Sequence, residues 1–177
     1  MAFSFWRKSP PKIKRILTII FFFLLSFIIT IVGVVTPLSF EEADSLSKEV
    51  EQLRQNISLQ FIFGNNFMIC LLMFVPIAGP VFGFYALYNT GVLIAADSIA
   101  HGLSPLTSSL LLFIYPVVWL EFLAYSTAFA ESVWLIWRII HHRGRRELVN
   151  ACILISICAV ILLAAAIIEI ALIVMLT

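Results

Sequence analysis

Few side chains in this sequence could do chemistry, and those few lie inside or beside apolar runs. Six polar residues are the candidates for an intramembrane site: Asn65, Asn66, Asn89, Asp97, His101 and Glu121. Ionisable groups inside a bilayer are costly, so they usually bind a partner group or line a pathway. Asp97 and His101 have the spacing of neighbours on one helix face. Two ligands do not define a metal site, and we expect this pair to be structural.

Glu121 is expected to be the most deeply placed of the carboxyl groups. Two interpretations are open for it: a carboxyl that hydrogen-bonds a neighbouring helix, or a group that handles protons or cations. Glu131 is expected near the lipid headgroups, where it can pair with Arg138 or with water. His141 and His142 belong to a basic loop and are expected at anionic headgroups.

The sequence contains no motif of a soluble enzyme. P-loop, GxGxxG, GxSxG, HExxH and CxxC patterns are all absent. The three cysteines, Cys70, Cys152 and Cys158, lie in apolar runs without metal-ligand spacing, and are expected to pack as small hydrophobic residues. We therefore predict that the protein is not an enzyme and that it needs no cofactor or metal.

The composition indicates a membrane protein. Of the 177 residues 62% are hydrophobic and only 12% are charged, and the mean hydropathy is +1.09. A soluble domain must cover itself with polar residues, which this chain lacks. Because lipid requires internally satisfied backbone groups, we predict an all-α, polytopic bundle in a single membrane domain. The net charge of +1 gives no reason to expect nucleic acid as a partner.

Apolar runs predict about five transmembrane helices. Their approximate ranges are 16–36, 61–78, 81–99, 106–138 and 148–176. Gly79-Pro80 is expected to separate the second helix from the third. The fourth run is too long for a bilayer about 30 Å thick, so it must tilt, kink or break, and Pro116 could kink it.

The basic residues predict the orientation. Five precede the first apolar run: Arg7, Lys8, Lys12, Lys14 and Arg15. Four more frame the loop before the last run: Arg138, Arg143, Arg145 and Arg146. Cytoplasmic segments are rich in Lys and Arg, so we expect a cytoplasmic N-terminus, an extracytoplasmic C-terminus and an acidic outer segment at about 40–60.

The outer segment has the pattern of an amphipathic helix. Ser39 and Glu42 match a capping box. An apolar stripe follows at helical spacing, made of Leu46, Val50, Leu53 and Ile57. This stripe is a candidate for docking a partner, or it packs on the ends of its own bundle. Gly79 and Gly83 form a GxxxG pattern, a second candidate for partner docking because it lets helices approach closely.

Residues from Gly64 to about Ile139 resemble the stage II sporulation protein M family of membrane proteins. The pattern runs in this order: Asn65-Asn66, Gly79 and Gly83, Asn89-Thr90-Gly91, His101-Gly102, and Pro116 to Glu121. Glu121 stands where the family has its Glu, whereas Val117-Val118 replaces the family's His-Gly. In sporulating bacteria such proteins act as membrane scaffolds in a complex that remodels the cell wall.

The resemblance and the lack of a ligand cluster favour a non-catalytic scaffold or accessory subunit of a larger membrane complex. Cell-envelope machinery, an oxidase and a monooxygenase are all open as that complex. The expected partners are other integral membrane subunits, the lipid bilayer and lipids in helix grooves. The alternative is a small transporter or an ion or proton pathway centred on Glu121.

Overall fold

The computed structural model describes residues 10–54, 57–140 and 144–176. His141 and His142 of the basic loop lie outside these ranges, as do Arg7, Lys8 and Arg143. The described part is all-helical and contains no strand. Its helices are α2 (Pro11–Val34), α3 (Phe40–Arg54), α4 (Leu59–Met73), α5 (Ala78–Ala100), α6 (Pro105–Leu112), α7 (Pro116–Ile140) and α8 (Gly144–Leu176).

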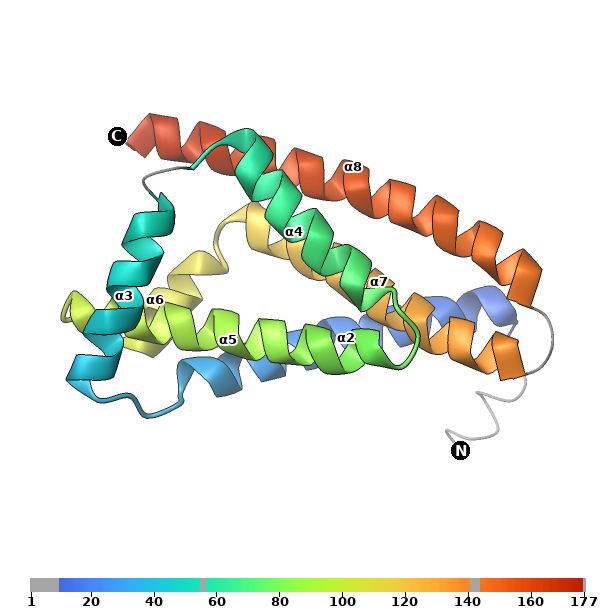
Figure 1. Cartoon of the computed structure of the whole chain (residues 1–177), viewed down its shortest axis with the longest axis horizontal. Coiled ribbons are helices and arrows are strands. Elements are labelled where there is room, and N and C mark those ends of the chain that lie inside the picture. Colours follow the sequence, from blue (N-terminus) through green and yellow to red (C-terminus); the bar gives the residue numbers. More distant parts are fainter. Residues whose placement is uncertain (1–9, 55–56, 141–143, 177) are drawn as a thin grey trace.

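The helices form an elongated bundle with two different ends (Figure 1). One end holds the start of α2 and the connection from α7 to α8, and we call it the α7–α8 end. The opposite end holds α3, α6 and the end of α8, and we call it the α3 end. Long helices run between the two ends, so the described part is a multi-pass membrane bundle.

The prediction of five transmembrane helices is wrong. Within the described residues three helices are long and apolar enough to cross a membrane: Lys12–Val34, Ala78–Ala100 and Leu148–Met175. The pair α6 and α7 makes a fourth only if it counts as one span, because the two helices are bent by 83°. The count is therefore three, or up to four.

The helix predicted at 61–78 is too short because it stops early. α4 has 15 residues, which rise about 22 Å, less than the apolar core of a bilayer. The break falls at residues 74–77 rather than at Gly79-Pro80, since Pro76 cannot continue the helix. Gly79 and Pro80 instead lie in the first turn of α5, where Pro is tolerated because the N–H groups there have no partner in the helix.

The turn between α4 and α5 is strained. Ile77 has φ 70° and ψ −57°, a region that β-branched residues rarely adopt, and the N–H of Ala78 donates to the Pro76 carbonyl at 2.8 Å, as in a γ-turn. The Ser132 hydroxyl of α7 donates to the Val75 carbonyl at 2.9 Å and ties this turn to the bundle.

The predicted helix at 106–138 is broken immediately before Pro116, and several backbone groups at the break are hydrogen-bonded. The N–H groups of Ile114 and Tyr115 donate to carbonyl groups of α6 at 3.1 Å each. The indole N–H of Trp119 donates to the Phe113 carbonyl at 2.7 Å. Backbone groups without partners are very costly in lipid, so these bonds make a sharp bend possible at this depth.

α7 is the central helix of the bundle. Residues 124–132 are all buried, because α2, α4, α5 and α8 pack around this stretch. Phe129 is fully buried, and its ring lies 5.5 Å from that of Phe22 and 4.8 Å from that of Phe84. Small residues between the two aromatic side chains Tyr125 and Phe129 let four helices surround α7 closely.

Two glycines let α2 and α5 cross with their backbones in contact. The Cα of Gly91 would lie 3.0 Å from a Cβ added at Gly33, and a Cβ at Gly91 would lie 2.9 Å from the backbone N of Val34. Near the crossing, the hydroxyl groups of Thr36 and Tyr88 hydrogen-bond at 3.0 Å. This close approach fixes the geometry of the two long helices.

Candidate functional site

The polar residues predicted from sequence fall into two groups in the structure, and a third group was not predicted. The first joins α4 to α7 and contains Asn66 and Glu121. The second joins α3 to α5 and contains Asp97 and His101. The third joins α2 to α7 at the α7–α8 end of the bundle.

Glu121 is tied to α4 by one short hydrogen bond. The amide of Asn66 donates to Glu121 Oε1 at 2.6 Å, although the two residues are 55 positions apart. Asn65 extends the group on its exposed side, since its amide lies 3.5 Å from Asn66 Oδ1. An amide paired with a carboxyl inside a bundle replaces hydrogen bonds that lipid cannot supply.

A second carboxyl group influences this pair electrostatically. Glu169 of α8 interacts electrostatically with Glu121 and with the buried Tyr125. Acidic groups whose charges interact bind and release protons as a coupled pair, which is a property that a proton pathway would use. Asn89 does not join them, because its side chain makes no hydrogen bond to any described residue.

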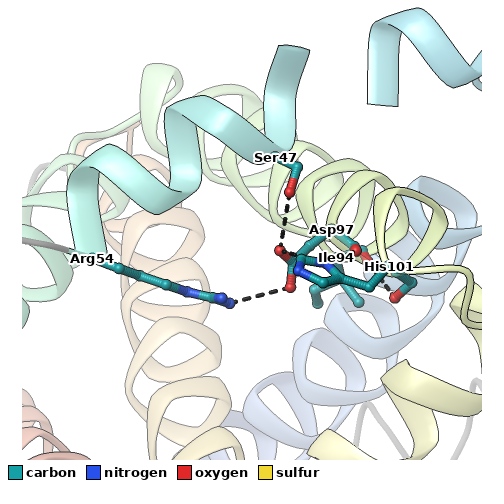
Figure 2. A network of polar contacts seen from close by, with 6 residues as sticks. Ser47, Arg54, Ile94, Asp97 and His101 are labelled. Carbon is teal, nitrogen blue, oxygen red and sulfur yellow. Dashed lines mark hydrogen bonds and ion pairs between the residues drawn. The ribbon is translucent and has the colours of Figure 1, made fainter. Parts of the chain in front are cut away.

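Asp97 holds α3 against α5 (Figure 2). Its Oδ1 accepts from the Ser47 hydroxyl at 3.3 Å, and its Oδ2 accepts from Arg54 Nη2 at 3.2 Å. Ser47 is buried in this contact. Two side chains of α3 therefore fix the outer helix to a single carboxylate of α5.

His101 supports the same carboxylate from its own helix. Its Nδ1 lies 2.7 Å from the carbonyl oxygen of Asp97 and 3.7 Å from Asp97 Oδ1. A carbonyl oxygen only accepts, so Nδ1 carries a proton and the pair forms an end cap of α5. No group of three or more His, Cys, Asp or Glu in the described ranges could hold a metal ion.

The sequence prediction for Glu131 is incomplete. Glu131 lies well inside the bundle, with a side chain only 2% exposed, and its Oε1 is 3.7 Å from Arg15 Nη2. Arg138, the expected partner, also interacts with it electrostatically. The only sequence signal for the contact between Arg15 and Glu131 is the position of Arg15, a basic residue at the start of the first apolar run.

The apolar stripe of the outer segment is only partly covered. α3 packs on α5, and its buried residues are Ala43 and Ser47 rather than members of the stripe. Leu46, Val50 and Ile57 are half-buried, while Leu53 is 56% exposed. Docking of a partner on this stripe stays a prediction, with Leu53 as its accessible residue.

Gly79 and Gly83 are packed against other helices of this chain. A Cβ at Gly79 would lie 2.7 Å from the carbonyl carbon of Met73, and one at Gly83 would lie 2.5 Å from the ring of Phe129. Both glycines are buried. They let α5 approach the end of α4 and the core of α7.

The fold and these contacts define a helical, multi-pass membrane protein whose polar groups join helices in pairs. Comparisons with protein-family models, with curated proteins and with solved structures find no match to this chain. The resemblance to the stage II sporulation protein M family accordingly enters as a proposal.

Proposed function

We propose that this chain is a non-catalytic scaffold or accessory subunit of a larger integral membrane complex, similar to the stage II sporulation protein M family. Its proposed partners are other membrane subunits, with the bilayer around them. The proposal includes a cytoplasmic N-terminus and an extracytoplasmic C-terminus. In support of this orientation, the basic start of α2 and the end of α7 lie at the same end of the bundle (Figure 1).

The observation that carries the proposal is the way in which carboxyl groups are held. Glu121 is bonded to α4, Glu131 is paired with α2, and Asp97 is bonded to α3. Each contact joins two helices of this chain. Fixed partners of this kind stabilise one arrangement of helices, which is the property that a scaffold needs.

The large apolar surface supports the same proposal. Only 22% to 28% of the residues in the apolar windows of the three long spans are buried inside the chain. The exposed side chains include Phe21, Leu24 and Ile28 on α2 and Val160 and Ile167 on α8. These faces are available both to lipid and to helices of neighbouring subunits.

One observation favours the alternative of an ion or proton pathway. Glu121 of α7 interacts electrostatically with Glu169 of α8, and it also accepts a hydrogen bond from the amide of Asn66. A pathway would require Glu121 to gain and lose a proton. A scaffold would require only an acceptor for the Asn66 amide.

The test separates these two requirements. We would replace Glu121 by Gln, which keeps an acceptor oxygen but cannot titrate, and by Leu, which keeps neither. The scaffold proposal predicts that Glu121→Gln co-purifies with the same partners as the native chain, so that the mass of the gently extracted assembly is unchanged. It predicts that Glu121→Leu loses these partners or is destabilised. A native chain that purifies alone, together with ion flux in vesicles that Glu121→Gln abolishes, would overturn the proposal in favour of a pathway.

A further inference from the structure

The α7–α8 end of the bundle contains a cavity that the proposed function does not use. Its volume is about 380 Å³, and it opens between α2, α7 and α8. This size is within the range of ordinary ligand sites. Figure 1 shows the start of α2, the end of α7 and the start of α8 gathered at this end.

The lining of the cavity changes from polar to apolar along the bundle axis. Its polar part, nearest the end of the bundle, is made of Lys12, Arg15, Glu131, Trp134 and Asn150. Ile16, Ile19, Ala130, Ile153 and Leu154 lie one or more helical positions deeper, together with Thr127, whose hydroxyl is already hydrogen-bonded to the Leu123 carbonyl. A polar head beside an apolar channel at the edge of a membrane span matches the shape of a lipid.

Two buried polar atoms in this lining have no hydrogen-bond partner within residues 10–54, 57–140 and 144–176. They are Glu131 Oε1 and Trp134 Nε1, although Arg15 lies 3.7 Å from the Glu131 oxygen and 5.7 Å from the centre of the Trp134 ring. Buried polar groups are normally satisfied, because an unsatisfied group carries its full desolvation cost. One atom needs a donor and the other needs an acceptor.

We propose that this cavity binds the headgroup of a phospholipid that carries both a phosphate and a primary ammonium group. The phosphate accepts from Lys12, Arg15 and the Trp134 indole N–H. The ammonium donates to Glu131 Oε1 and to the Asn150 side chain. The upper part of an acyl chain lies along Ile16, Ile19 and Leu154.

The arrangement of charges distinguishes this headgroup from two common alternatives. A phosphatidylglycerol headgroup offers no cation to the Glu131 oxygen. A quaternary choline headgroup offers a positive charge but no N–H to donate. A charge-assisted hydrogen bond to Glu131 should therefore give phosphatidylethanolamine about a tenfold advantage over either lipid.

The test uses the full-length chain, delipidated in detergent and titrated with each of the three diacyl lipids while bound lipid is counted by native mass spectrometry. We expect one phosphatidylethanolamine to bind per chain, with half-saturation at about tenfold lower lipid concentration than for the other two lipids. Glu131→Gln should remove this preference. Lys12→Gln, at an exposed position, should weaken the binding of all three lipids severalfold, whereas Lys48→Gln at the α3 end should leave their binding unchanged.

Equal binding of the three lipids, or an unchanged preference in Glu131→Gln, would overturn the proposal. If Glu131→Gln does not fold, an unchanged affinity in Lys12→Gln overturns it instead. Glycerophosphoethanolamine, the soluble headgroup, is the remaining probe. Binding as tight as that of the lipid would show a site for a soluble phosphoamine and overturn the assignment to a lipid.

Discussion

Gly33 offers the sharpest test of the packing, because a single methyl group there meets backbone rather than side chains. In Gly33→Ala the added Cβ would contact the Tyr88 carbonyl oxygen and would lie 3.0 Å from the Gly91 Cα. Backbone atoms cannot rotate away, so α2 and α5 must separate. Overpacking costs about 1–3 kcal/mol, and we take the upper value. Alanine regains about 1 kcal/mol of helix propensity, which leaves a net loss of about 2 kcal/mol.

The matched control is Gly64→Ala in α4. Gly64 also lies inside a helix, but a Cβ there meets nothing within 4 Å. This variant should gain about 0.5–1 kcal/mol, because glycine is a poor helix former. The two substitutions are chemically identical, so their difference of about 3 kcal/mol reports the helix crossing alone, and it equals about 100-fold in the unfolding equilibrium.

The assay is reversible unfolding of the purified chain in mixed micelles, followed by far-ultraviolet circular dichroism as the SDS fraction rises. Gly33→Ala should unfold at a lower SDS fraction than the native chain, and Gly64→Ala at an equal or higher one. If Gly33→Ala is as stable as Gly64→Ala, α2 and α5 do not cross at Gly33 and Gly91.

Three further predictions concern the turn at Ile77 and helix α3. Ile77→Gly should raise the free energy of unfolding by about 1 kcal/mol in the same assay, because glycine adopts the positive φ without strain; a loss would contradict the strain. Asp97→Asn should speed proteolysis of α3 severalfold, since it removes the ion pair with Arg54, and an unchanged cleavage rate would refute that role. Hydrogen bonds from the Ser39 N–H and hydroxyl lower the pKa of Glu42 below its usual 4.5, so the cap stabilises α3 above that pH and is lost as pH falls through the lowered value. Hydrogen exchange in α3 should rise there; Glu42→Gln, which cannot titrate, should abolish this pH dependence, and Ser39→Ala, which keeps the N–H donor, should only reduce it.

Local patterns in the sequence were sufficient for several elements. The runs predicted at 81–99 and 148–176 correspond to α5 and α8, because long apolar stretches have few alternatives to a helix. The capping box is confirmed: the Ser39 N–H donates to Glu42 Oε2 at 2.9 Å, and the Glu42 N–H donates to Ser39 Oγ at 3.3 Å. Such signals lie within a few residues of one another, so no knowledge of the fold is needed.

Contacts between distant residues could not be predicted in this way. Asn66 and Glu121 were both named as candidates, but nothing in their spacing indicates that α4 and α7 bring them to 2.6 Å. Glu131 was expected near the headgroups because it lies toward the end of its predicted helix, with Arg138 or water as its partner. Its contact with Arg15 depends on α2, which is distant in sequence but packs against α7.

The central position of α7 has a consequence for the order in which the chain is assembled in the membrane. Its carboxyl groups find their partners on α2 and α4, and both helices precede it in the chain. Because the chain is synthesised from its N-terminal side, Arg15 and Asn66 reach the membrane before Glu121 and Glu131 enter the bilayer. Both carboxyl groups therefore meet their partners as α7 inserts, and α8, which follows α7 in the chain, packs against a helix whose carboxyl groups already have partners.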